Sequence, residues 1–353
     1  MSLFAAYFWE MLRTSGVWLI LSFIVCGLLH GILKPEVLQK SLGNKKLSSI
    51  LKATVSGMLL PMCSCGVLPL ALGLYYSGAY LGPTLAFLVA TPIINPAALI
   101  LSFALLGPEI SVIYLASGLV LPVIIGIVGN KFGGSIAQSP YTPSQEIMFT
   151  KGESRPLAAK LIGGLKWGFE DLAVQTCKFI LVGVAFAALF LAVIPAPLFQ
   201  SYLGSPGVIS LIAVTLLGAL MYVCATGHIP FIAAMLSAGA VPGTALAFLL
   251  AGVSTNLPEI LSIWKLIGKR AVLIYTGMVV VFGLIIGYGV NLVLAENFIP
   301  QFDLSQSAQG IELAGYFNLQ FPAELKTICA AAVVLIGLYG WGNVLRRTFN
   351  TDS

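Results

Sequence analysis

The chain has 353 residues, of which 58% are hydrophobic and only 9% are charged, and its net charge is +5. Soluble domains carry about 25% charged residues, so this composition excludes a soluble protein with a single anchor. It predicts an all-α, polytopic membrane protein with about eight to ten membrane segments. The lipid bilayer is therefore an expected partner, and no nucleic-acid partner or cofactor is expected. The six cysteines lie mostly within apolar runs, which argues against a secreted disulfide framework.

Apolar runs divide the chain into successive predicted membrane segments. The first run lacks a small-residue cleavage site, so it is interpreted as a retained span. Residues 1–16, which precede it, are interpreted as an interfacial amphipathic lead-in. The predicted segments cover residues 17–33, 53–76, 82–106, 109–129, 175–195, 208–236, 243–264, 271–292 and 327–345.

Residues 61–96 recur later in the chain. Adding 161 to each number aligns them without a gap on residues 222–257, and twelve of the 36 aligned pairs are identical. Apolar composition alone gives roughly one chance identity in ten, so the two stretches are predicted to be copies of one structural unit. Weaker matches extend both copies. The predicted organisation is repeat one at 8–130, a cytoplasmic linker at 131–167, repeat two at 168–291, an external loop at 292–326 and a C-terminal transmembrane helix at 327–347.

Charges are distributed oppositely in the two copies. The loop 34–52 contains five lysines and one acid, whereas its equivalent, 195–213, is uncharged. Conversely, Glu109 is matched by a region that contains Lys265, Lys269 and Arg270. Because lysine and arginine favour cytoplasmic loops, this pattern predicts two inverted-topology repeats. The predicted N-terminus is outside and the predicted C-terminus is cytoplasmic.

This sidedness requires a re-entrant segment in each copy. An odd number of crossings must separate the loop 34–52 from Glu109, yet two apolar segments, 53–76 and 82–106, lie between them. One of the two must enter the membrane and return, and the sequence does not decide which. Broken helices should be buried within protein or line a water-filled cavity. The predicted helix-breaking residues are Gly66, Pro69, Pro92, Pro96, Gly227, Pro230 and Pro258.

Three thiols and an imidazole lie close to two of these predicted breaks. Cys63 and Cys65 flank Ser64 in copy one, while Cys224, Thr226 and His228 stand in copy two. Thiolates and imidazole suit soft or borderline ions, so Cys63, Cys65, Cys224 and His228 are candidate metal ligands as well as candidate substrate contacts. The alternative is that these cysteines are small buried hydrophobic residues.

Paired asparagines mark the other two breaks. Asn95 and Asn256 are equivalent in the repeat, and the hydroxyls of Thr91, Ser254 and Thr255 lie beside them. An amide offers both a donor and an acceptor, so these side chains are predicted to bind substrate. The alternative is that they only satisfy the broken backbone.

Several other polar residues favour structural roles. Glu259 stands near Lys265 at the end of an apolar segment and is expected to reach the membrane interface. The glycine-rich motif that ends at Gly82, and its equivalent that ends at Gly243, are expected to allow close helix contact. The same structural interpretation applies to Cys26, His30, Cys177 and Cys329.

Two motifs together resemble a known family. The block Pro61-x-Cys-Ser-Cys-Gly-x-x-Pro69, followed by Ala90-Thr-Pro-x-x-Asn-Pro96, is similar to the predicted permeases that include ArsP and YraQ. The resemblance covers nearly the whole chain, and it implies a permease more firmly than it implies a substrate. ArsP-type members are linked to efflux of trivalent organoarsenicals, and related permeases are assigned to soft-metal export.

The leading functional prediction is a secondary transporter of the bacterial inner membrane that exports a small thiophilic solute, such as a trivalent arsenical or a soft metal. A transporter of a sulfur-containing metabolite or another small solute, with structural cysteines, is the first alternative. A membrane thiol oxidoreductase that uses Cys63 and Cys65 is the second, although Cys-x-Cys is an unusual redox spacing. A transporter is favoured over an enzyme.

Overall fold

The computed structural model describes residues 3–32, 42–60, 64–76, 78–133, 157–193, 207–220, 225, 228–229, 232–233, 236, 240–294 and 321–351. Within these ranges every regular element is a helix. A π-helical turn, η2 (Gly168–Ala173), joins two of them. The α-helices are α1 (Leu3–Ile32), α3 (Leu47–Met58), α4 (Ser64–Tyr76), α5 (Leu81–Ile93), α6 (Pro96–Leu105), α7 (Gly107–Phe132), α9 (Leu157–Trp167), α10 (Val174–Val193), α12 (Val208–Leu220), α14 (Pro242–Ser254), α15 (Leu257–Leu266), α16 (Lys269–Leu294) and α18 (Ala323–Thr351).

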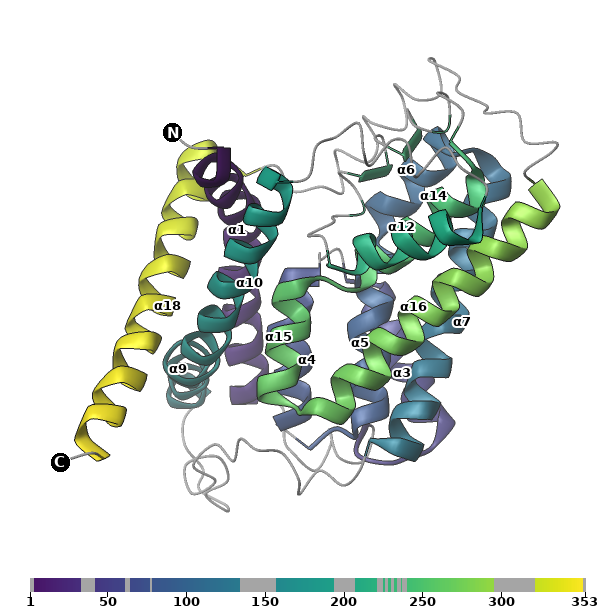
Figure 1. Cartoon of the computed structure of the whole chain (residues 1–353). Coiled ribbons are helices and arrows are strands. Elements are labelled where there is room, and N and C mark those ends of the chain that lie inside the picture. The colour runs from purple at the N-terminus through teal and green to yellow at the C-terminus, as the bar shows by residue number, and fades with distance from the viewer. Residues whose placement is uncertain are drawn as a thin grey trace.

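The helices form two groups that meet at α4 and α15 (Figure 1). On one side α1 packs against α9, α10 and α18, and α10 also packs against α18. On the other side α5 packs between α3 and α7, while α14 packs between α12 and α16. The groups are joined because α1 contacts α4 and α10 contacts α15.

Corresponding helices of the two sequence copies have matching bounds. Adding 161 to the limits of α5, 81 and 93, gives 242 and 254, which are the limits of α14. The same offset carries α6, 96–105, onto α15, 257–266. Gly107, the first residue of α7, and Gly268, which directly precedes α16, both have positive φ and are also 161 apart. The local folding rules are therefore the same in both copies.

Equivalent helices run in opposite directions in the view of Figure 1. The chain enters α1 at the top beside the N-terminus and descends, whereas α10 rises from α9 at the bottom. Likewise α7 descends from α6 at the top, and α16 rises from the lower end of α15.

Helices α3 and α4 form an open hairpin, in which both helices pack against α5 and the chain returns to its starting point. The backbone N–H of Tyr80, after α4, donates to the carbonyl of Leu42, before α3, at 3.0 Å. The Lys45 ammonium also lies 5.7 Å from the centroid of the Tyr80 ring. At 1.5 Å per residue each helix is about 18–20 Å long, so the ends can meet only if the chain doubles back. At the next break the chain bends but does not double back, because the angle between α5 and α6 is 44°.

Four of the described helices are long and apolar enough to cross a membrane, or up to six if each bent pair forms one span. This count covers the described residues only, and each of the two bends divides one expected membrane segment into two shorter helices. The predicted interfacial lead-in at 1–16 is not set apart from the first span in the described residues. Residues 3–16 are continuous with the rest of α1, Leu12 is fully buried, and Gly16 lies against the backbone of Ala330 in α18.

Two glycines hold equivalent helices in close contact, as predicted for the glycine-rich motifs. A Cβ atom on Gly82 would collide with the carbonyl oxygen of Gly126 in α7, and one on Gly243 would collide with that of Gly287 in α16. The same approach allows the Gly82 N–H to donate to the Asn130 side chain at 3.0 Å. Gly243 donates to Asn291 at 2.8 Å in the second copy.

We expect Gly82→Ala and Gly243→Ala each to destabilise the protein by about 1–3 kcal/mol, because the added methyl group meets backbone atoms that cannot move alone. The measurement is the fraction of detergent-solubilised protein that stays monodisperse after heating. Gly277→Ala, in α16, is the matched control, because no atom of another residue lies within 4 Å of the added Cβ. Equal losses in all three variants would contradict the close-contact interpretation.

Candidate transport site

In both bent helix pairs, the second helix begins after an asparagine. Asn95 caps α6, and its side-chain oxygen accepts from the Ala97 N–H at 2.9 Å. Asn256 caps α15 and accepts from the Glu259 N–H at 2.9 Å. Each cap satisfies one of the backbone donors that the start of a helix leaves without an intrahelical partner. The paired asparagines therefore stabilise backbone that would otherwise be unsatisfied in apolar surroundings.

The proline and glycine residues predicted to break helices occupy several different positions. Gly66 and Pro69 lie inside α4, so the interruption between α3 and α4 precedes them. Pro92 lies inside α5, one residue before its end. Pro96 is the first residue of α6, and Pro258 is the second residue of α15. In the first turn of a helix the backbone N–H has no intrahelical partner, so its absence from proline costs no hydrogen bond. Gly227 and Pro230 fall outside the described residues.

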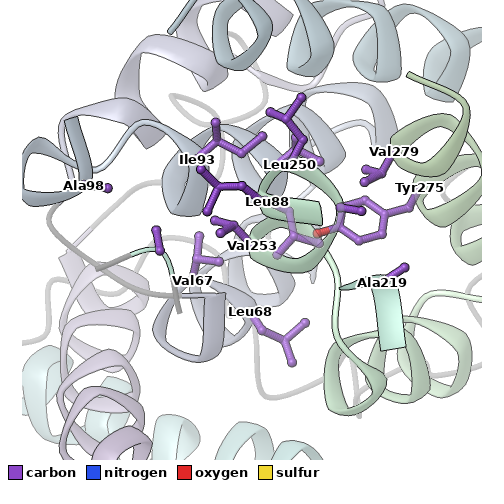
Figure 2. Close-up of a cluster of buried hydrophobic side chains, with 14 of the residues drawn as sticks. Val67, Leu68, Leu88, Ile93, Ala98, Ala219, Leu250, Val253, Tyr275 and Val279 are labelled. Carbon is purple, nitrogen blue, oxygen red and sulfur yellow. The ribbon is translucent and has the colours of Figure 1, made fainter. Parts of the chain in front are cut away.

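The apolar side chains beside the two breaks belong to one buried cluster. Ile93, the last residue of α5, lies near Leu250 and Val253 of α14 (Figure 2). Val67 of α4 lies in the same cluster. Helices α5 and α14 also pack directly against each other. The two breaks therefore adjoin the contact between the two copies rather than the outer surface.

The predicted hydroxyl groups bond mainly to their own helices. Thr91 donates to the Phe87 carbonyl at 2.9 Å, and Ser254 donates to the Leu250 carbonyl at 2.6 Å. Thr255 lies 2.8 Å from the Ala251 carbonyl and 3.3 Å from that of Ala219 in α12. All three side chains are completely buried. In this conformation their donors satisfy backbone carbonyls, and their remaining lone pairs are the groups that a solute could use.

Glu259 does not reach the interface, so that prediction was wrong. The side chain is only 2% exposed. It accepts from the Asn256 amide at 3.1 Å and from the Tyr275 hydroxyl of α16 at 2.9 Å. The same hydroxyl is hydrogen-bonded to the Ser254 carbonyl at the end of α14. The Glu259 carboxyl and the Tyr275 hydroxyl together thus connect α14, α15 and α16 at the second break.

The sequence carried two signals for this cluster. Glu259 stands three residues after Asn256, which is the spacing of a capping box. Its equivalent in copy one is Ala98, so the carboxyl is present in one copy only. The nearby Lys265 suggested an interfacial position instead, but its side chain is exposed and lies over the Trp264 ring.

The predicted thiol site falls largely outside the described side chains. This applies to Cys63, Ser64, Cys65, Cys224 and Thr226, so their role in binding stays a prediction. His228 is described, and its ring lies 6.3 Å from that of Phe248 in α14. Among the described side chains, no group of three or more His, Cys, Asp or Glu residues could hold a metal ion.

The cysteines expected to be structural are buried and form no disulfide. They are Cys26, Cys177 and Cys329. Cys26 lies 3.7 Å from the Pro69 carbonyl, so it contributes to the contact between α1 and α4. The side chain of His30 is outside the described part of the chain.

The ArsP_1 family of predicted permeases matches residues 1–292. The chain belongs to this family. UPF0718 protein MJ0584 of Methanocaldococcus jannaschii is 28% identical over 333 residues, which cover 78% of this chain and 91% of that protein. UPF0718 protein YraQ of Escherichia coli is 25% identical over 285 residues, covering 80% of each chain.

A third relative is the Streptococcus mutans protein named "Putative two-component membrane permease complex subunit". It is 22% identical over 289 residues, covering 80% of this chain and 94% of that protein. No solved structure matches the chain. Family membership and the apolar helices together identify a multi-pass membrane permease.

We expect the two asparagine caps of this permease to differ in importance. Asn95→Ala should cost about 1 kcal/mol, the usual loss for a helix cap. Asn256→Ala should cost more, because it also removes the amide that donates to buried Glu259. Thermal stability of the purified variants gives the comparison.

Asn256→Ser separates the two contributions, since serine keeps a capping oxygen but cannot replace the amide donor. A stability between those of Asn256→Ala and the unchanged protein is expected. If Asn95→Ala were as damaging as Asn256→Ala, the bond to Glu259 would not matter.

Proposed function

We propose that this permease is a secondary transporter that exports a small thiophilic solute, such as a trivalent organoarsenical or a soft metal ion, across the bacterial inner membrane. The observation that carries the transporter proposal is the pair of capped helix breaks beside the contact between the two copies. Secondary transporters with internal repeats bind their solutes at such discontinuous helices, near the middle of the membrane.

The arrangement of the helices supports inverted repeats. Equivalent helices α1 and α10 run in opposite directions, as do α7 and α16 (Figure 1). The basic residues agree, because Lys45 and Lys46 precede α3 whereas Lys269 and Arg270 begin α16. In this proposal the two sets share the cytoplasmic side, and Glu109 at the start of α7 is outside.

The α3–α4 hairpin is the re-entrant segment of copy one in this proposal. Its two ends meet through the hydrogen bond between Tyr80 and Leu42, so it returns to the side on which it began. The bent pair α5–α6 is then the crossing that leads to the outside. This assignment satisfies the odd number of crossings that the loop charges require.

The solute class follows from the thiols that the sequence places next to the start of α4 and its equivalent. Cys63, Cys65 and Cys224 provide soft ligands of the kind that bind trivalent arsenic or Cu(I), and His228 adds an imidazole. Asn95 and Asn256 supply polar groups at the two bends. The sequence contains no nucleotide-binding motif, so an ion gradient or a separate partner would drive transport. The name of the S. mutans relative makes a second subunit one candidate for such a partner.

Cells that express this permease should accumulate less of a trivalent methylated arsenical than cells without it, and should survive higher concentrations. Cys63→Ser and Cys224→Ser should each lower this protection about tenfold or more, because one soft ligand is lost and 1.4 kcal/mol corresponds to a factor of ten. Uptake into inverted membrane vesicles gives the direct measurement.

Cys177→Ala is the matched control, because that cysteine is completely buried, its backbone carbonyl lies close to Gly337 of α18, and it is assigned a structural role. Protection lost equally in all three cysteine variants would contradict the soft-ligand site. A mixed disulfide trapped by Cys65→Ser, without any flux, would favour a thiol oxidoreductase. Flux of a sulfur-containing metabolite that needs none of the cysteines would favour the other alternative.

The topology can be tested separately by labelling single cysteines introduced at exposed positions in a variant without native cysteines. Positions 46 and 269 should react from the cytoplasmic side only, and position 109 from the outside only, because of the charges described above. Labelling of all three positions from one side would rule out the inverted arrangement, while leaving the solute open.

A further inference from the structure

At the second helix break, Glu259 belongs to a hydrogen-bonded group of three oxygen atoms. The Tyr275 hydroxyl is hydrogen-bonded both to the Ser254 carbonyl and to Oε1 of Glu259. On the other side of the carboxyl, Oε2 accepts from the Asn256 amide. Tyr275 is completely buried, and Glu259 is 2% exposed, so bulk water does not complete this network.

The state of the carboxyl decides how many donors this group of oxygen atoms contains. The Tyr275 hydroxyl has one proton, and the Ser254 carbonyl can only accept. An ionised Glu259 also only accepts, so the single Tyr275 proton is then shared between two acceptors. A protonated Glu259 supplies a second donor, which can donate to Tyr275 while Tyr275 donates to Ser254.

The fold does not require a carboxyl at this position. In copy one the equivalent of Glu259 is Ala98, yet α6 begins after the same kind of asparagine cap and has the same length as α15. The equivalent tyrosine, Tyr114, is also present and completely buried. A capping box alone therefore does not explain why copy two places an ionisable group in the interior.

Among the described contacts of Glu259, one is made by a titratable side chain from a helix that packs against α15. It comes from Tyr275 of α16, whereas α10 approaches α15 through Gly183, which lies against Pro258. Other titratable or charged groups on these helices and on α15 are Cys177, Lys178, Tyr75, Tyr76, Lys265, Lys269, Arg270 and Tyr288, together with Cys65, whose side chain is outside the described part.

For two of these groups, Lys178 and Tyr76, the described contacts lie away from Glu259. The stem of Lys178 lies against Gly340 of α18, which is on the opposite side of α10 from α15 (Figure 1). The Tyr76 hydroxyl donates to the Leu266 carbonyl at the far end of α15.

We propose that Glu259 is the proton-carrying site of this permease, and that its protonation and deprotonation couple a proton gradient to solute movement. This inference rests on the proposed transport function. Proton binding adds a second donor to the network between the end of α14, the start of α15 and α16. Proton release leaves the Tyr275 proton shared between two acceptors, which weakens the network and frees the bend between α14 and α15 to change. Ionisable groups within the membrane are characteristic of proton relays, and this one is built directly into a helix break.

The first test does not depend on the solute. Infrared spectra of the purified full chain in lipid vesicles at about pH 7 should contain the C=O band of a protonated carboxyl, since exposed carboxylates are ionised far above their usual pKa of about 4. Glu259→Gln should remove this band. Glu109→Gln, which changes an exposed carboxylate at the start of α7, should leave it intact. A band that is absent, or that survives Glu259→Gln, would show that the pair with Asn256 is a capping box only.

The second test uses vesicles loaded with trivalent methylarsenite as the probe. A gradient of one pH unit should drive up to about tenfold accumulation for each coupled proton. In Glu259→Gln the ratio of flux with and without the gradient should fall to one. Flux that follows a sodium gradient instead would overturn the proposal. If no arsenical moves but the infrared band behaves as expected, the solute assignment fails and the proton site stands.

Discussion

The structure depends on one constraint: backbone N–H and C=O groups within an apolar interior must find partners when a helix is interrupted. Both bent pairs meet this constraint in the same way, with an asparagine whose side chain caps the second helix. The hydroxyls nearby return to carbonyls of their own helices. Because most of the polar capacity around the breaks is used internally, only a few groups remain with spare lone pairs for a solute.

The two copies share a scaffold but differ in chemistry. Helix limits, glycine contacts and asparagine caps recur at one constant offset, so packing imposed the same solution twice. The polar content of the breaks is unequal, since Ser254 and Glu259 stand where copy one has Ile93 and Ala98. A transporter built in this way can keep two similar halves for movement while one of them carries the ionisable group.

Most of the fold could be predicted from the sequence, because apolar runs, breakers and a gapless repeat are local features. The burial of Glu259 was not predicted, because the capping-box spacing from Asn256 does not reveal the contact with Tyr275 in another helix. The loop charges predict only the parity of the crossings. The contact between Leu42 and Tyr80 supports the proposal that α3 and α4 form the re-entrant segment of copy one.

The bond between Gly82 and Asn130 fastens the beginning of α5 to the end of α7, far from the bend that separates α5 from α6. The other end of α7 is joined to α6 through Leu106, which ends α6 and precedes α7. The three helices therefore form a triangle that is fastened at each corner. A change in the bend between α5 and α6 cannot move α6 alone and must also shift the start of α7.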